Sequence, residues 1–168
     1  HIDLCDLPHI DHRSSVDRLP MIDDASVELI YASHVLEYFD REEAIDVLRE
    51  WSRVLLPGGT LRIAVPDFAA LTRVYRQYGD LQKVLGPLYD KMQVDRGNGW
   101  TTTIYHKTVY DFDSLAGLLE GAGFGEVRRY DWRETIHKDY DDHSQAYIPH
   151  MDKEDGLLIS LNVEATKR

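Results

Sequence analysis

Residues 27–67 read VELIYASHVLEYFDREEAIDVLREWSRVLLPGGTLRIAVPD and decide the fold of this chain. Residues 27–32 are rich in apolar, β-branched and aromatic side chains, which predicts a strand. Asp40 and Glu43 form a capping-box pattern, and the apolar residues that follow recur at helical spacing up to Pro57-Gly58-Gly59. The next residues, TLRIAV, predict a second strand. A strand, a helix and a strand in this order are typical of an α/β domain.

Beyond this unit, strand-like and helical patterns continue to alternate along the chain. They predict strands over 1–4, 126–130 and 157–165, and helices over 68–78, 81–92 and 114–120. Gly86-Pro87 should kink the second of these helices, and Asp113 should cap the third. Residues 157–165 alternate apolar and polar side chains, which indicates a half-buried antiparallel strand. We therefore expect one α/β domain over 1–168, with a mostly parallel sheet and an antiparallel last strand.

The composition is that of an ordinary globular protein. The chain has 168 residues, of which 43% are hydrophobic and 29% are charged, and this size suits one domain. The net charge of −11 disfavours nucleic acid and anionic lipid as partners, because both need clustered Lys and Arg. No apolar run approaches the roughly 18 residues of a membrane span. The single Cys5 excludes a disulfide framework, and we expect a cytoplasmic location; the oligomeric state stays open.

Polar side chains follow three of the expected strands, at the sheet edge where open α/β sheets bind ligands. Asp3 is placed to accept the hydroxyls of a ribose, or to cap a turn. His34 is a candidate general base or substrate contact, or a residue that only holds its loop. Glu37 caps the following segment or faces a substrate. Asp67 is a candidate catalytic carboxylate and also a suitable N-cap for the next helix.

The segment 93–110 is long for a connection without periodicity, and its aromatic and His content argues against disorder. We expect it to form a lid-like insert over the site, with His106 and Tyr110 on this cover and outside the core. The remaining histidines have no zinc-binding spacing and are expected to be solvated loop residues, so no metal site is predicted. The glycines of 121–125 end a helix and open a strand, which makes them turn residues and not a nucleotide-binding fingerprint.

Three stretches of the chain resemble a known family. They read LPMIDDASVELIYASHVLEYF (19–39), VLREWSRVLLPGGTLRIAVPDF (47–68) and YHKTVYDFDSLAGLLEGAGF (105–124). Their order and spacing resemble those of the class I S-adenosylmethionine-dependent methyltransferases, although the family commonly has His where this chain has Tyr38. The resemblance extends over nearly the whole chain. It implies a Rossmann-like fold with the strand order 3-2-1-4-5-7-6 and S-adenosylmethionine as the cofactor.

The resemblance also implies roles for individual residues. Asp3 would end the second family strand and bind the cofactor ribose, with Ser15 or Asp17 near the adenine. The residues expected beside the methionine moiety and the transferred methyl are Ala32, Ser33 and His34. Asp67 would face the acceptor, and the segment with His106 and Tyr110 would cover it. The candidate catalytic residues are His34, Asp67 and His106.

The family's first strand and its glycine-rich cofactor loop have no counterpart in this sequence. In the family order that strand lies between the second and the fourth, so two strand edges would face each other unpaired. We expect the native protein to extend upstream of His1 with this strand and loop. The resemblance implies methyl transfer to a small-molecule, sugar or lipid-linked acceptor. The alternative is a non-catalytic or degenerate Rossmann-like binding or interaction module.

Overall fold

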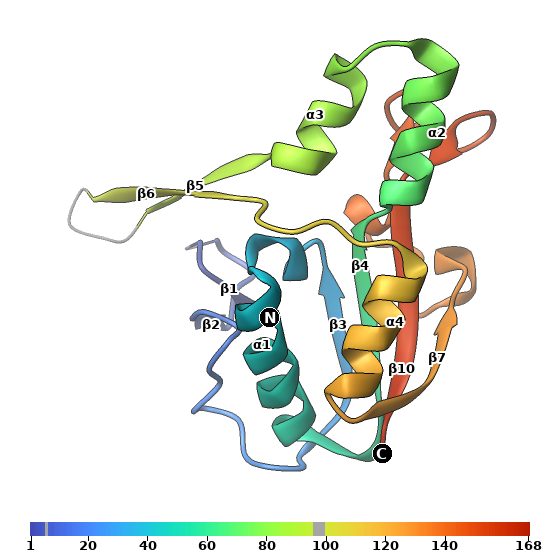
Figure 1. Ribbon diagram of the computed structural model, residues 1–168. Coiled ribbons are helices and arrows are strands. Elements are labelled where there is room, and N and C mark those ends of the chain that lie inside the picture. The colour runs from blue at the N-terminus through green and yellow to red at the C-terminus, as the bar shows by residue number, and fades with distance from the viewer. Residues whose placement is uncertain (6, 96–99) are drawn as a thin grey trace.

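Helices and strands alternate in the computed structural model, which describes residues 1–5, 7–95 and 100–168 (Figure 1). The helices are α1 (Arg41–Val54), α2 (Phe68–Tyr78), α3 (Gln82–Tyr89) and α4 (Phe112–Gly121). The longer strands are β3 (Val27–Ser33), β4 (Leu55–Pro66), β5 (Lys91–Asp95), β6 (Thr101–Tyr105), β7 (Phe124–Arg129) and β10 (Ser160–Lys167). Two-residue strands are β1 (Ile2–Asp3), β2 (His12–Arg13), β8 (Tyr147–Ile148) and β9 (Leu157–Leu158).

The main sheet has four strands in the order β3-β4-β10-β7. Strands β3 and β4 are parallel, with Ile30 opposite Leu61. Strand β10 runs antiparallel to both of its neighbours, so β3, β4 and β7 share one direction. These directions confirm the predicted mostly parallel sheet with an antiparallel last strand. The order also matches the 4-5-7-6 part of the order that the resemblance implies.

Strands β1 and β2 form a separate parallel pair and, within the described residues, make no ladder with β3. An apolar cavity of about 410 Å³ lies between this pair and β3. Ile2 lines it on the β1 side, and Leu29, Ile30 and Trp51 line it on the β3 side. Strand β3 is therefore an edge of the main sheet. No described strand pairs β1 with β3, so the expected gap between the second family strand (β1) and the fourth (β3) is present.

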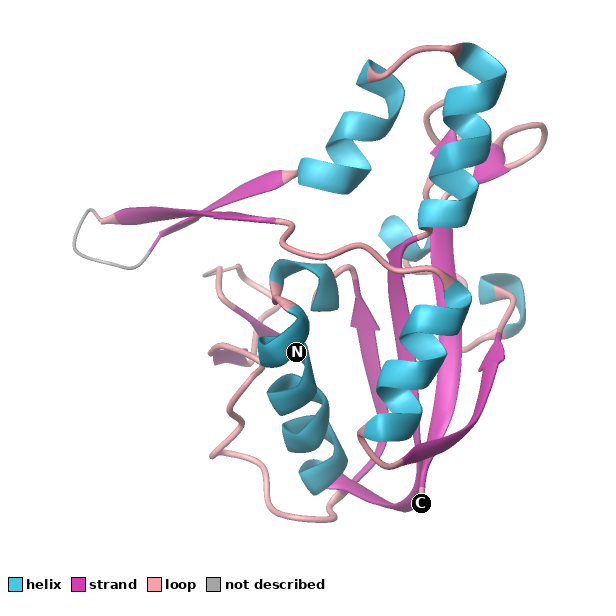
Figure 2. Cartoon of the chain, viewed as in Figure 1, coloured by secondary structure: helices cyan, strands magenta, loops and turns pink. Residues whose placement is uncertain are grey.

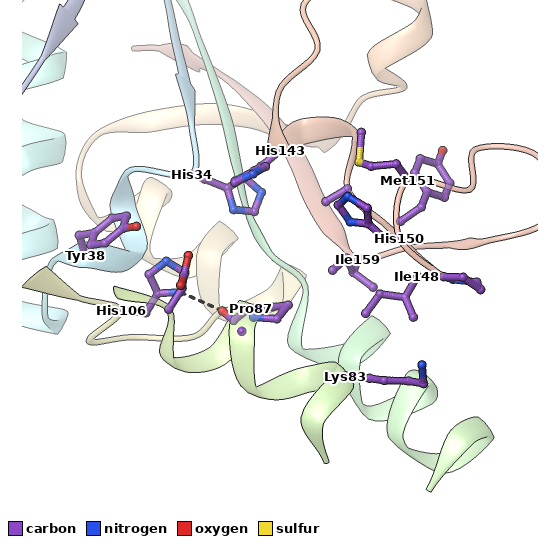
Figure 3. Close-up of a pocket in the computed structure, with 15 residues that line it drawn as sticks. His34, Tyr38, Lys83, Pro87, His106, His143, Ile148, His150, Met151 and Ile159 are labelled. Atoms are coloured by element: carbon purple, nitrogen blue, oxygen red, sulfur yellow. Dashed lines mark hydrogen bonds between the residues drawn. The ribbon is translucent and has the colours of Figure 1, made fainter. Parts of the chain in front are cut away.

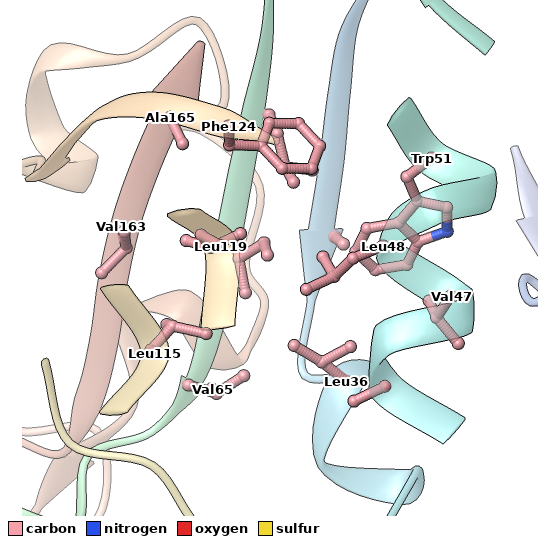
Figure 4. Close-up of a cluster of buried hydrophobic side chains, with 14 of the residues drawn as sticks. Leu36, Val47, Leu48, Trp51, Val65, Leu115, Leu119, Phe124, Val163 and Ala165 are labelled. Atoms are coloured by element: carbon pink, nitrogen blue, oxygen red, sulfur yellow. The ribbon is translucent and has the colours of Figure 1, made fainter. Parts of the chain in front are cut away.

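Helices α1 and α4 cover one face of the main sheet (Figure 2). Leu48 and Trp51 of α1 and Leu115 and Leu119 of α4 are nearly inaccessible to water and pack against the strands (Figure 4). Asp40 Oδ1 accepts the backbone N–H of Glu43 at 2.9 Å, and the side chain of Glu43 accepts that of Asp40 at 2.8 Å. The predicted capping box at the start of α1 is thereby confirmed.

Several expected boundaries are wrong. Helix α4 is capped by Asp111 and not by Asp113, because the carboxylate of Asp111 accepts the N–H of Ser114 in a second capping box. Helix α3 ends at Tyr89, two residues after Pro87, and does not reach position 92. The segment expected to be irregular contains the antiparallel hairpin of β5 and β6 instead, because side chains such as Met92 and Ile104 pair across it.

Tyr110 is also placed differently from the prediction. Its side chain is only 4% exposed and belongs to the main core cluster. Asp67 and Tyr110 form an isolated parallel bridge, which anchors this part of the insert to the end of β4. Tyr110 is therefore a core residue, and the expectation that it lies outside the core is wrong.

Strand β10 is buried on both faces near its start, so the prediction of a half-buried strand is wrong there. Ser160, Leu161, Asn162 and Val163 are all buried, because the polar excursion after β7 (residues 132–155) covers the second face of the sheet. Within that excursion His137 is buried and stacks on Tyr31, with ring centroids 3.9 Å apart, so it is not a solvated loop residue. No helix among the described residues has the length and apolar character needed to cross a membrane.

Candidate active site

Two cavities lie at the carboxyl end of β3. The first, the β1-side cavity, has a volume of about 490 Å³ and is lined in part by Asp3, Ser15, Val16, Ser33, Met92 and Ile104. The second, the α3-side cavity, has a volume of about 580 Å³ and is lined in part by Lys83, Pro87, His106, Ile148, Met151 and Ile159 (Figure 3). His34, Tyr38 and His143 line both cavities. The two cavities therefore share a wall at the end of β3.

His34 sits on that shared wall in a fixed conformation. It follows directly after β3, and its backbone φ of 53° lies in the left-handed region that residues with a Cβ rarely adopt. Its backbone N–H donates to the carbonyl of Ala64 at 2.8 Å, which ties the turn to β4. Nδ1 of the ring lies 3.0 Å from Glu37 Oε1, and Nε2 lies 3.2 Å from Ser160 Oγ. Strained backbone held by its surroundings is frequent at functional sites.

Glu37 is a fully buried carboxylate between two histidines. It belongs to a 3₁₀ helix, Leu36–Tyr38, and its side chain is 0% exposed. Oε1 lies 3.0 Å from Nδ1 of His34 and 4.0 Å from Nε2 of His106. On its other side, Nδ1 of His106 is 2.9 Å from the carbonyl of Pro87 (Figure 3). Neither carboxylate oxygen of Glu37 has a hydrogen-bond partner among the described residues, so the two rings lie near a buried polar group that they leave unsatisfied.

Tyr38 adds a hydroxyl group at the boundary between the cavities. Its ring meets that of His106 edge-on, with centroids 4.7 Å apart. Burial, together with the nearby carboxylates of Asp90 and Glu37, raises the pKa of Tyr38 to about 12. The hydroxyl therefore keeps its proton at neutral pH and is available as a hydrogen-bond donor.

The polar excursion after β7 supplies the third shared residue, His143. This residue begins a 3₁₀ helix, His143–Gln145, and its ring meets that of His34 edge-on at 5.3 Å. Tyr31 anchors the excursion, because its hydroxyl donates to Asp142 Oδ2 at 2.6 Å. Burial and this hydrogen bond raise the pKa of Tyr31 to about 12, which keeps it a donor.

The structure brings five of the predicted site residues to the cavities. Asp3, Ser15, Ser33 and His34 line the β1-side cavity, and His106 lines the α3-side cavity. His106 does not lie on an exposed cover, since its side chain is only 5% exposed.

The other predicted site residues lie elsewhere. The side chain of Ala32 is buried in the core, and Asp17 lies outside the residues that line either cavity. Asp67 Oδ1 accepts the N–H of Ala70 at 3.2 Å, and Oδ2 lies 3.4 Å from Nη1 of Arg129. Asp67 thus acts as the N-cap of α2, as its sequence position allowed, and does not line either cavity; its expected role toward the acceptor stays a prediction.

Sequence reasoning missed Tyr38, His143 and Ser160 as site residues. Tyr38 was visible as a departure from the family pattern. His143 lies in an acidic stretch that has no motif, and only the return of that stretch over β3 brings it to the site. Ser160 belongs to the polar half of an alternating strand, so the pattern predicted a solvent-facing side chain and gave no signal for its burial.

The β1-side cavity has side chains that suit part of an adenosine-containing cofactor. Asp3 is half-buried at the end of β1, and its Oδ1 accepts the N–H of Cys5 at 2.7 Å, which orients the carboxylate. Ile2, Val16, Val35 and Met92 supply apolar walls. Such a carboxylate beside apolar walls suits a ribose and an adenine, and the volume lies within the usual ~300–1,000 Å³ of ligand sites. Among the described residues, no group of three or more His, Cys, Asp or Glu side chains is arranged to hold a metal ion.

Part of the chain matches a known protein family. Residues 7–63 match the family model of a methyltransferase domain. No curated protein sequence matches the chain significantly.

Solved structures with the same fold include several methyltransferases. One is a SAM-dependent methyltransferase from Methanosarcina mazei, 18% identical, with a TM-score of 0.54 over 94% of this chain and 66% of that one. A possible histamine N-methyltransferase from Thermotoga maritima is 17% identical, with a TM-score of 0.53 over 95% of this chain and 64% of that one. A putative S-adenosylmethionine-dependent methyltransferase from Listeria monocytogenes is 18% identical, with a TM-score of 0.53 over 99% of this chain and 78% of that one.

This chain therefore spans less than two thirds of the length of the first two of these proteins. Its fold and its sequence over residues 7–63 point to the same family. Residues 7–63 thus resemble a methyltransferase domain, and the chain shares the fold of S-adenosylmethionine-dependent methyltransferases; together these findings support a class I S-adenosylmethionine-dependent methyltransferase.

Proposed function

We propose that this chain binds S-adenosylmethionine in the β1-side cavity and transfers its methyl group to an acceptor in the α3-side cavity. The observation that carries the proposal is the wall that the two cavities share at His34, Tyr38 and His143. Direct group transfer requires that donor and acceptor be held in contact and aligned. Two ligand-sized cavities that share His34, Tyr38 and His143 would supply this arrangement.

In the β1-side cavity, the carboxylate of Asp3 would hold the ribose hydroxyls. Ser15 and the apolar side chains near it would lie along the adenosine, and Ser33 and His34 would lie toward the methionine end. When bound, S-adenosylmethionine supplies an electrophilic methyl group on a positively charged sulfur. The residues of this chain position that group and exclude water from it.

The α3-side cavity favours a small-molecule, sugar or lipid-linked acceptor with a hydroxyl group. Ile148, Met151 and Ile159 give it an apolar wall, while His34 and His106 supply imidazole nitrogens that are able to take a proton. The net charge of −11 disfavours a nucleic-acid acceptor.

We also propose that the insert of 93–110 acts in part as a cover. Met92 and Ile104 of the β5–β6 hairpin line the β1-side cavity, so movement of these strands would open or close it. A cover that excludes water strengthens the electrostatic interactions inside a site.

We also propose a cytoplasmic location for this protein, because a chain with one cysteine suits a reducing compartment.

Calorimetric titration of the protein with S-adenosylmethionine, and then with S-adenosylhomocysteine, tests this function. We expect one saturable site for each, and competition between the two ligands. Methionine alone is the matched control ligand, and it should give no saturable heat because it lacks the ribose that Asp3 would hold. If the folded protein binds neither adenosine compound, the proposed function is wrong, and the alternative of a non-catalytic binding module is favoured.

A further inference from the structure

Two oppositely charged side chains lie at different ends of the α3-side cavity. Among the described residues that line it, Lys83 is the only lysine or arginine and Asp90 is the only carboxylate. The backbone carbonyl of Asp90 accepts the N–H of His106 at 3.0 Å, and the ring of His106 contacts that of Tyr38. Figure 3 shows Tyr38 and His106 at one end of the lining and Lys83 at the other. The cavity therefore has a cationic end and an acidic end.

The positive charge of Lys83 is not neutralised by the protein. Its ammonium group forms no ion pair with a carboxylate in the described part of the chain. Nζ lies over the ring of Tyr78 instead, 5.1 Å from the ring centroid. A ring face attracts an ammonium group but leaves its charge in place. An anionic group that enters this end of the cavity would therefore meet an uncompensated positive charge.

The acidic end of the cavity disfavours an anion and suits a hydroxyl group. Asp90 lines this end, and the buried carboxylate of Glu37 lies behind the same wall, 4.0 Å from Nε2 of His106. A further anion beside these carboxylates would be repelled, and more strongly where water is excluded. A hydroxyl group is neutral, and it can hydrogen-bond to the hydroxyl of Tyr38 or to an imidazole nitrogen.

We propose that the acceptor is an amphipathic anion, whose carboxylate or phosphate group binds Lys83 and whose hydroxyl group lies at the Tyr38 end. This inference rests on the proposed function, because it names the class of acceptor for the same site. Ile148, Met151 and Ile159 make much of the remaining wall apolar, so they suit an apolar skeleton between the two groups. A lysine ammonium is a compact charge that binds carboxylate and phosphate alike.

This orientation brings the hydroxyl group to the cofactor. Tyr38 belongs to the wall that the two cavities share, whereas Lys83 lines the α3-side cavity alone. An acceptor held by its anionic group at Lys83 therefore presents its hydroxyl group at the shared wall, on the side where S-adenosylmethionine would lie. Lys83 would act as a binding residue that sets the specificity for the acceptor, at a distance from the transferred methyl group.

NMR titration of the full chain without cofactor tests this inference with three matched probes. They are para-hydroxyphenylpropanoate, para-hydroxyphenylethyl phosphate and the uncharged amide para-hydroxyphenylpropanamide, which share a phenol and an apolar linker. We expect at least one of the anions to bind about three- to tenfold more tightly than the amide, because a partly exposed ion pair contributes modestly to affinity. The preference should weaken as salt is added. The tighter of the two anions identifies the acceptor group as carboxylate or phosphate.

Lys83→Gln should abolish the preference for the anion and leave the affinity for the amide unchanged. Lys138→Gln is the matched control and should keep the preference, because Lys138 is an exposed lysine that lines neither cavity. Anions that bind no more tightly than the amide, or a preference that survives Lys83→Gln, would overturn the inference. Because these titrations need no cofactor, a Lys83-dependent preference without S-adenosylmethionine binding would contradict only the proposed function.

Discussion

The backbone N–H of Phe68 donates to the carbonyl of Tyr110 at 2.9 Å, and this bond ties the start of α2 to the segment that leads into α4. The ring of Tyr110 is buried, and its hydroxyl has no hydrogen-bond partner among the described residues. Burial raises the pKa of this hydroxyl, so it stays neutral. Tyr110 thus stabilises the protein through its ring and not through its polar group.

The first prediction concerns the two parts of Tyr110. Tyr110→Phe should leave the free energy of unfolding unchanged or raise it by up to about 1 kcal/mol, because a buried unpaired hydroxyl is unfavourable. Tyr110→Ala should lower it by about 3–5 kcal/mol through the lost packing. Urea denaturation measures both. A Tyr110→Phe variant as unstable as the alanine variant would show that the hydroxyl has a partner.

The second prediction concerns Asp3 and cofactor affinity. Asp3→Ala should weaken S-adenosylmethionine binding about tenfold to a hundredfold, since a charge-assisted hydrogen bond contributes roughly 1.5–3 kcal/mol. Calorimetry measures the dissociation constant. Asp23→Ala is the matched control, because it removes an equal charge from an exposed loop outside both cavities. Equal affinities of the two variants would make Asp3 only a turn residue.

The third prediction separates the two cavities. His106 lines the α3-side cavity alone, so His106→Ala should change S-adenosylmethionine affinity by less than about twofold while it slows methyl transfer. Its side chain is buried and contacts the Pro87 carbonyl, so the variant should also lose about 1–3 kcal/mol of stability. Calorimetry and urea denaturation of one preparation test the binding and the stability. A large loss of cofactor affinity in a folded variant would place His106 in the cofactor site.

The fourth prediction is a dependence of stability on pH. Burial, with Arg62 nearby, lowers the pKa of His137 in the folded state. As the pH falls below about 6.5, the unfolded chain takes up the proton first, so the folded state loses stability. The melting temperature should therefore fall between pH 7.5 and pH 5, by about 2–4 °C for each ~1 kcal/mol lost.

His137→Phe checks the origin of that fall. Phenylalanine keeps a ring against Tyr31, where the two rings stack at 3.9 Å, but it does not titrate. Its melting temperature should fall less steeply over the same pH range. Calorimetric scans of both proteins at several pH values make the comparison. Parallel curves would assign the acid sensitivity to other groups.

The fifth prediction concerns the motion of the insert. Strands β5 and β6 pair only with each other in the described residues, whereas Tyr110 is held in the core. Amide hydrogen exchange should therefore be fast over 91–95 and 101–105, and it should slow when S-adenosylmethionine binds. Tyr110 should exchange slowly in both states. Hairpin amides as protected as those of β4 without ligand would rule out a movable cover.

The sequence alone determined the elements whose signals are local. The capping box at Asp40, the apolar period of α1 and the apolar pattern of β3 each depend on residues a few positions apart, and all three are present as expected. The strand pattern also placed Asp3, Ser33 and His34 at the ends of strands, where the cavity is found. These features hold because hydrogen-bonding caps and side-chain periods act within one element.

Only the tertiary structure decided which polar side chains meet. Ser160 reaches His34 across 126 positions of sequence, and no local pattern encodes that contact. The same is true of His143, which arrives at the site because Tyr31 and Asn162 hold the polar excursion over the sheet. Asp67, at a strand end like His34, turns instead to cap α2. A strand end places a side chain near the site, but the packing of distant segments determines where that side chain points.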